Sequence, residues 1–118
     1  MVLVVDDDPN FLEQAMQSLN SGKGLFIARD AKQAKELMGC VGAAFSLVLI
    51  DLDLPGQDGF SLIHEMRAAF PDLPVIAISG VCQHDVLESA KLMGATAALS
   101  KPIDSAWNLA IAEAKSKH

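Results

Sequence analysis

Residues 47–59 read LVLIDLDLPGQDG, an apolar run that ends at a carboxylate and passes into a loop rich in glycine and proline. A short apolar run bounded by turn residues is typical of a strand buried on both faces of a sheet. Such strands belong to parallel sheets that helices cover on both sides. The stretch therefore predicts an α/β fold in which Asp51 follows a buried strand.

Four more short apolar runs lie on either side of this one, and helical stretches alternate with them. The expected strands are residues 2–6, 24–28, 46–50, 74–79 and 96–100. The expected helices begin near Pro9, Asp30, Gly59, His84 and Asp104, and Gly94 is expected to end the fourth. This alternation predicts a doubly wound, five-stranded parallel sheet with helices on both faces.

The first helix shows the pattern most clearly. Asp8 followed by Pro9 is a favourable N-cap with proline at the first helical position. Its apolar face would comprise Phe11, Leu12, Ala15, Met16 and Leu19. Trp107, early in the last helix, is expected to pack in the core.

Composition limits the classes of function. The chain has 118 residues, enough for one domain that spans 1–118. No apolar run approaches the roughly 20 residues of a membrane span, and no secretory signal is visible, so a cytoplasmic protein is expected. The net charge of −6 disfavours direct binding to nucleic acid or to anionic membranes. Cys40 and Cys82 lack the spacing of metal ligands, so they are expected to be reduced and partly buried.

Polar residues recur where the expected strands end. Asp6 and Asp7 follow the first strand, Asp51 follows the third, Ser79 ends the fourth and Lys101 follows the fifth. Ligands of open α/β sheets collect at the carboxyl ends of the strands, so these five side chains are expected at one edge. Each alone has an ordinary explanation as a cap, a turn or a surface charge, and their co-occurrence favours a site.

Three carboxylates at one edge repel one another unless a cation lies among them. Oxygen ligands without His or Cys favour Mg²⁺, with Mn²⁺ as a substitute. A carboxylate can also attack phosphorus and form an aspartyl phosphate. Lys101 would then neutralise phosphoryl charge and Ser79 would donate a hydrogen bond.

Four motifs in order make the chain resemble the receiver domain of two-component response regulators over essentially its whole length. They are VLVVDDDP, LVLIDLDLPGQDG, PVIAISG and LSKP. The resemblance implies a flavodoxin-like strand order of 2-1-3-4-5. It also implies that Asp51 is the phosphoacceptor and that Mg²⁺ is held by Asp6, Asp7, Asp51 and the backbone carbonyl of Asp53. Ser79 and Lys101 match the family's hydroxyl and lysine positions, and a cis peptide bond is implied between Lys101 and Pro102.

The resemblance further implies a switch rather than a turnover enzyme. The phosphoryl group would come from a histidine kinase or a histidine phosphotransfer protein. The face of the fourth helix, fifth strand and fifth helix would serve output or homodimerisation. Many receivers carry an aromatic residue or His three positions before the lysine, where this chain has Ala98. The switch would then rely on Ser79 without an aromatic partner.

Two other interpretations stay open at this stage. Asp51 and Asp53 form the DxD of haloacid-dehalogenase-type phosphatases, although Pro55 is unusual for them. A receiver-like interaction module that phosphate does not control is the other, because Ala98 departs from the pattern. We expect either a stand-alone receiver or one domain of a longer regulator. Gly56 and Gly59 are expected to supply the backbone angles that the loop after Asp51 needs.

Overall fold

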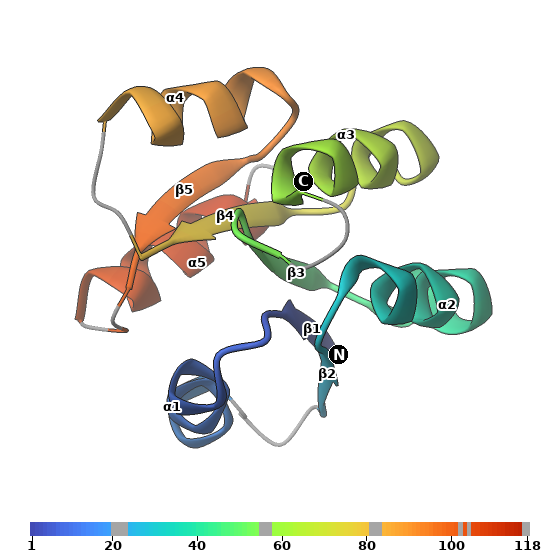
Figure 1. Ribbon diagram of the computed structural model, residues 1–118, viewed down its shortest axis with the longest axis horizontal. Coiled ribbons are helices and arrows are strands. Elements are labelled where there is room, and N and C mark those ends of the chain that lie inside the picture. Colours follow the sequence, from blue (N-terminus) through green and yellow to red (C-terminus); the bar gives the residue numbers. More distant parts are fainter. Residues whose placement is uncertain (20–23, 55–57, 81–83, 102, 104, 117–118) are drawn as a thin grey trace.

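The computed structural model describes residues 1–19, 24–54, 58–80, 84–101, 103 and 105–116. In these residues, strands alternate with helices along the whole chain (Figure 1). The strands are β1 (Val2–Val5), β2 (Leu25–Ala28), β3 (Leu47–Asp51), β4 (Val75–Ser79) and β5 (Ala97–Ser100). The helices are α1 (Pro9–Leu19), α2 (Ala31–Val41), the 3-10 turn η1 (Gly42–Ala44), α3 (Gly59–Ala69), α4 (His84–Leu92) and α5 (Ser105–Ser116).

The five strands form one parallel sheet in the order β2-β1-β3-β4-β5. This order confirms the predicted doubly wound topology, and each strand lies within a residue or two of its expected bounds. The chain reverses its direction of progress across the sheet between β1 and β3. In such sheets that reversal opens the crevice in which ligands bind, beyond the carboxyl ends of the strands.

The three inner strands are buried along their whole length, whereas the edge strands are not. Every residue of β1, β3 and β4 is buried, and β2 and β5 are mostly half-buried. An inner strand of a parallel sheet has a layer of helices on both faces. Its side chains are therefore shielded from water whichever face they point to. For this reason the inner strands read as continuous apolar runs in the sequence.

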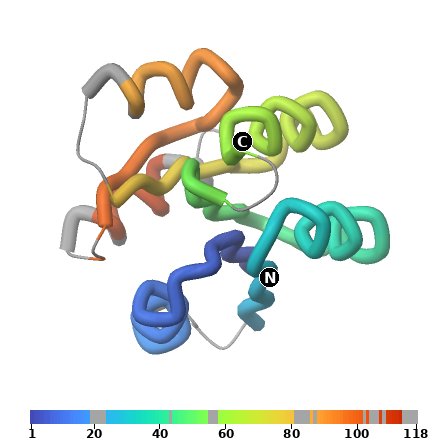
Figure 2. Tube along the Cα trace, viewed as in Figure 1, coloured from blue at the N-terminus to red at the C-terminus, as the bar shows by residue number. Residues whose placement is uncertain are grey.

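Helices cover both faces of the sheet (Figures 1 and 2). One face is covered by α1 and α5, and the other by α2, α3 and α4. The first core contains Val4, Phe11, Leu12, Leu49, Ile78 and Trp107. The second contains Leu3, Val5, Ala34, Met38, Ile50, Leu62, Ile63 and Met66. The sheet thus separates two cores, and side chains alternate between them along each inner strand.

Side-chain caps fix where two of the helices begin. The carboxylate of Asp30 accepts a hydrogen bond from Gln33 N at 2.8 Å, as predicted for the start of α2. Asp58 accepts one from Ser61 N, also at 2.8 Å, at the start of α3. Gly94, which follows α4, has φ of +121°, a conformation that L side chains rarely adopt. Asp104, Pro102 and the peptide bond before Pro102 lie outside the described residues.

Two predictions about burial are wrong. Met16 is 52% exposed rather than part of the core, because it lies at the edge of the α1 face that meets the sheet. Cys40 is exposed as well, on the solvent side of α2, and Cys82 lies outside the described residues. Trp107, in contrast, is only 2% exposed, which confirms its place in the core. Among the described helices, none combines the length and the apolar character that crossing a bilayer requires.

Arg67 connects the end of α3 to the turn between α4 and β5. Its Nε donates to Gly94 O at 2.9 Å, its Nη1 to Pro71 O at 2.8 Å and its Nη2 to Thr96 Oγ1 at 3.1 Å. A planar guanidinium can satisfy three acceptors in fixed directions, which neither lysine nor an apolar side chain can do. Arg67 therefore holds the turn that leads into β5.

We expect Arg67→Leu to lower the free energy of unfolding by about 1–3 kcal/mol, because partly buried carbonyl groups lose their donors. Urea denaturation measures this. Arg29→Leu, at an exposed position, is the matched control and should change stability by less than about 0.5 kcal/mol. Equal effects of the two substitutions would contradict the role given to Arg67.

Candidate functional site

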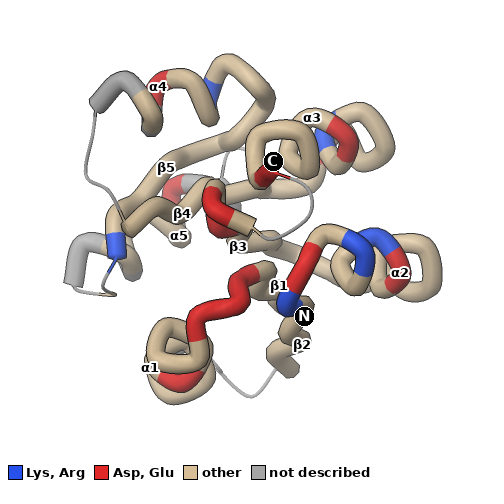
Figure 3. Tube along the Cα trace, in the orientation of Figure 1, with Lys and Arg blue, Asp and Glu red and all other residues tan. Residues whose placement is uncertain are grey.

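Three carboxylates meet at the carboxyl edge of the sheet. Asp6 directly follows β1 and is fully buried, Asp51 is the last residue of β3 and is 4% exposed, and Asp7 is exposed. Each offers a carboxylate oxygen, and these three oxygens all lie within 4.8 Å of one another. Figure 3 shows this gathering of acidic residues where the chain leaves β1 and β3. Residues 45 positions apart are close because β1 and β3 are neighbours in the sheet.

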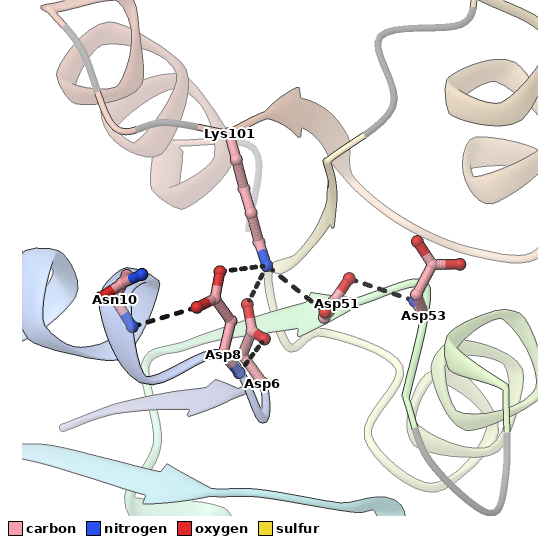
Figure 4. A network of polar contacts seen from close by, with 6 residues as sticks. All are labelled: Asp6, Asp8, Asn10, Asp51, Asp53 and Lys101. Atoms are coloured by element: carbon pink, nitrogen blue, oxygen red, sulfur yellow. Dashed lines mark hydrogen bonds and ion pairs between the residues drawn. The ribbon is translucent and has the colours of Figure 1, made fainter.

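The ammonium group of Lys101 lies among these carboxylates (Figure 4). Its Nζ is 2.7 Å from Asp6 Oδ2, 3.5 Å from Asp51 Oδ2 and 3.7 Å from Asp8 Oδ2. The backbone holds the residue in place, since Lys101 N donates to Ser79 O at 2.9 Å. Burial acts to lower the pKa of Lys101, but the close contact with Asp6 and the charges of Asp51, Asp6 and Asp8 outweigh it and raise the pKa. Lys101 is therefore a firmly charged cation.

Asp51 is a carboxyl group whose pKa is strongly shifted. Burial raises its pKa to about 6, and the neighbouring charge of Asp6 acts in the same direction. The hydrogen bond from Asp53 N to Asp51 Oδ1, at 3.1 Å, and the charge of Lys101 act in the opposite direction. One nearby ammonium group thus does not fully compensate for the burial of this carboxylate.

The residues present fit a hard divalent cation. Asp6 Oδ2 is a buried oxygen without a hydrogen-bond partner of good geometry in the described part of the chain, although Lys101 Nζ is close to it. Its other oxygen accepts a hydrogen bond from Asp8 N at 2.9 Å, which fixes the orientation of the carboxylate. The clustered donors are carboxylate oxygens from Asp6, Asp7 and Asp51, the ligand type that Mg²⁺ prefers.

Gly59, the first residue of α3, holds the loop after Asp51 by close contact. Its N–H donates to Leu52 O at 3.1 Å. A Cβ at Gly59 would overlap the carbonyl oxygen of Asp51 and lie 2.6 Å from Leu52 Cα. The backbone of Gly59 does not have positive φ, so the prediction that it supplies unusual angles is wrong. The glycine is needed because α3 begins directly against the main chain of Asp51. Pro55 and Gly56 lie outside the described residues.

The remaining predicted site residues occupy different positions. Ser79 is buried at the end of β4, where it pairs in register with Ser100. The side chain of Asp53 is exposed and points away from the Lys101 ammonium (Figure 4), so the DxD motif does not place two carboxylates on this ammonium. Ala98 lies within β5 and packs against the core under α2, α3 and α4.

Two residues near Lys101 were not predicted as part of the site. Asp8 was interpreted only as a helix cap, and it does accept a hydrogen bond from Asn10 N at 3.0 Å. Its other oxygen, however, forms the third ion pair of Lys101. Phe11 was assigned to the core, yet its ring centroid lies 4.9 Å from Lys101 Nζ. The run of three aspartates was the one signal in the sequence for Asp8, and Phe11 carried none.

Comparison with known proteins gives a consistent result. A family model for the response regulator receiver domain matches residues 2–112. The response regulator protein FleR of Pseudomonas aeruginosa is 35% identical over 103 residues, which cover 87% of this chain and 22% of FleR. The DNA-binding transcriptional regulator NtrC of Escherichia coli K12 is 31% identical over an alignment of 121 positions, which covers 100% of this chain and 25% of NtrC. The chain thus spans about a quarter or less of these two relatives.

Solved structures share the fold. The receiver domain of NtrX from Brucella abortus superposes with a TM-score of 0.85 at 30% identity, over 99% of this chain and 98% of that one. The BeF3-activated DrrB receiver domain gives a TM-score of 0.83 at 21% identity, over 99% and 97% of the two chains.

The raised pKa of Asp51 predicts a pH-dependent stability difference between the protein and its Asp51→Asn variant. The carboxyl group has its ordinary pKa of 3.8 when unfolded and about 6 when folded, so the folded state holds this proton more tightly. Its contribution to stability is fully present below about pH 4 and is lost as the pH rises through 6. In metal-free buffer at pH 7, we expect the free energy of unfolding of Asp51→Asn to be about 1–2 kcal/mol higher than that of the wild type.

Urea denaturation with a chelator at several pH values measures this difference. It should shrink as the pH falls from 7 toward 4. A variant less stable than the wild type at pH 7 would contradict the account of Asp51.

Magnesium is expected to stabilise the folded protein through the same carboxylates. At a Mg²⁺ concentration of ten times Kd, the free energy of unfolding should rise by about 1.4 kcal/mol. Asp7→Asn should remove most of this gain, because the exposed carboxylate is lost as a ligand. Glu36→Gln, on the exposed surface of α2, removes one negative charge elsewhere and should keep the full gain. Thermal unfolding with and without MgCl₂ is the measurement, and an unchanged Mg²⁺ effect in Asp7→Asn would exclude this site.

Proposed function

Because the chain belongs to the response regulator receiver domain family, we propose that Asp51 accepts a phosphoryl group from a phosphohistidine of a histidine kinase or histidine phosphotransfer protein. One observation carries the proposal: a buried carboxylate lies 3.5 Å from a lysine ammonium and within 4.8 Å of two further carboxylates. The arrangement combines a nucleophile with the charges that phosphoryl transfer needs, since that reaction depends mainly on positioning and charge neutralisation.

The proposed step is an in-line displacement at phosphorus. A carboxylate oxygen of Asp51 forms the new O–P bond while the P–N bond of the phosphohistidine breaks. The electron pair of that bond stays on the imidazole nitrogen, which takes up a proton. Asp51 has to be ionised to attack. Because its pKa is raised to about 6, the carboxyl group must lose its proton before the transfer. Water later hydrolyses the acyl phosphate and restores the carboxylate.

The side chains around Asp51 have distinct proposed roles. Lys101 neutralises charge on the phosphoryl oxygens, and the Ser79 hydroxyl donates a hydrogen bond to one of them. Asp6, Asp7, Asp51 and the backbone carbonyl of Asp53 would hold Mg²⁺, or Mn²⁺ in its place. When bound, this ion neutralises charge on the carboxylates and on the entering phosphoryl group.

The chain is proposed to act as a switch in the cytoplasm rather than as a turnover enzyme. Its chemistry is limited to its own phosphorylation and to hydrolysis of the product. Its net charge of −6 supports the proposal that this chain does not itself bind nucleic acid. Two apolar side chains, Leu92 in α4 and Leu109 in α5, are 88% and 65% exposed. The face formed by α4, β5 and α5, to which these two helices belong, is proposed to dock a target or a second copy of the chain.

The direct test is incubation with MgCl₂ and a small phosphodonor such as acetyl phosphate. Intact mass spectrometry should show the gain of one phosphoryl group, and Asp51→Asn should show none. Asp53→Asn is the matched control on the same loop, because only its backbone is proposed to take part, and it should still gain the group. Lys101→Met should slow the gain by about 100-fold. An unmodified wild-type mass under these conditions would refute the proposed function.

A further inference from the structure

Phe11 and Trp107 form an aromatic pair directly beneath the site. Their ring centroids are 5.6 Å apart at an interplanar angle of 48°, a tilted geometry within the range that favours aromatic pairs. Phe11 belongs to α1 and Trp107 to α5, and both side chains are buried in the core shared by these helices. The pair therefore joins the helix that follows β1 to the helix that follows β5.

The ammonium group of Lys101 lies over the face of the Phe11 ring. The distance from Nζ to the ring centroid is 4.9 Å, inside the roughly 6 Å over which a cation is attracted to an aromatic ring. The ring is buried and the lysine side chain is largely so. Cation–π attraction is strongest when both groups are shielded from water. Phe11 thus provides the apolar wall of a site whose other walls are Asp6, Asp8 and Asp51.

Trp107 in turn contacts the backbone next to the same lysine. Its indole Nε1 donates to Ser100 O at 3.1 Å, and Ser100 is the residue directly before Lys101. The contacts run from the Lys101 ammonium to Phe11, from Phe11 to Trp107, and from Trp107 to the backbone that carries Lys101. These contacts connect the ammonium group of Lys101 to α5 through the two rings.

We propose that Phe11 positions Lys101 and that, together with Trp107, it transmits phosphorylation of Asp51 to α5. The inference rests on the proposed function and extends it to the transmission of the signal. It assigns this task to the α1/α5 side of the sheet. On the other side of the sheet, Ala98 packs against the core under α2, α3 and α4. Alanine has no ring that could take part in a switch there.

Phosphorylation changes what holds the lysine. In the structure Lys101 Nζ is nearest to Asp6, at 2.7 Å, and more distant from Asp51, at 3.5 Å. A phosphoryl group on Asp51 adds anionic oxygens beyond the present carboxylate, so the ammonium group is drawn from Asp6 toward them. Displacement along this direction alters its contact with the Phe11 face. Since the interior is densely packed, the ring and its neighbour Trp107 adjust together.

Trp107 is the only tryptophan of the chain, so its fluorescence reports this adjustment without interference. Samples of wild type and Phe11→Leu are incubated with MgCl₂ and acetyl phosphate, and each is measured by intact mass and by emission spectrum. We expect both proteins to reach a gain of one phosphoryl group, the Phe11→Leu protein more slowly because its Lys101 is positioned less firmly. The emission of Trp107 should change in the wild type, and most of this change should be lost in Phe11→Leu. Phe11→Tyr keeps the aromatic face and should restore it.

Two further variants separate transmission from a general loss of packing. Leu12→Val trims a buried neighbour of Phe11 on the same helix and should keep the full change in emission. In unphosphorylated protein, Lys101→Met should shift the emission of Trp107, and this shift should disappear when it is combined with Phe11→Leu.

The outcomes distinguish this inference from the proposed function. A phosphorylated Phe11→Leu protein that keeps the full change in emission overturns the transmission through Phe11 and leaves the phosphoacceptor role of Asp51 intact. A Lys101→Met shift that persists in the Phe11→Leu background overturns it as well. A wild-type protein that gains no phosphoryl group by mass refutes the proposed function, and the inference falls with it.

Discussion

The arrangement of the site depends on one electrostatic constraint, the crowding of carboxylates around a single lysine ammonium at the edge of a parallel sheet. Asp6 and Asp51 are both buried, and Lys101 is the cation that contacts both of them. Burial of like charges is costly unless cations and hydrogen bonds compensate for it. The raised pKa of Asp51 shows that the compensation is partial. A site in this condition suits a divalent cation, and the sheet holds the carboxylates of Asp6 and Asp51 close together.

The fold serves this constraint through its topology. The strands that carry Asp6 and Asp51 are neighbours, and the strand that leads to Lys101 is held at its end by the bond from Lys101 N to Ser79 O. Gly59 adds the last element, because it lets α3 begin directly against the main chain of Asp51. All of these contacts are made between main-chain atoms. The main chain therefore fixes where the side chains of the site begin.

Most of the fold could be predicted from the sequence, because the inner strands are continuous apolar runs and their polar ends mark one edge. The common edge of the carboxylates followed from their places at the carboxyl ends of parallel strands, whereas the strand order came from the resemblance to receiver domains. The contacts of Phe11 could not be predicted, since an apolar residue on a helix face gives no sign that a lysine 90 positions later lies over its ring. Met16 shows the converse difficulty: helical periodicity places it on the apolar face of the first helix, yet its side chain is 52% exposed.

The separation of two cores by one sheet has a consequence for how such a protein can diverge. Among the residues that the structure describes, the side chains under α1 and α5 form one core cluster and those under α2, α3 and α4 form another. Substitutions can therefore accumulate on one side while the packing of the other stays as it was. A substitution that removes an aromatic ring from one core therefore need not disturb the packing of the other.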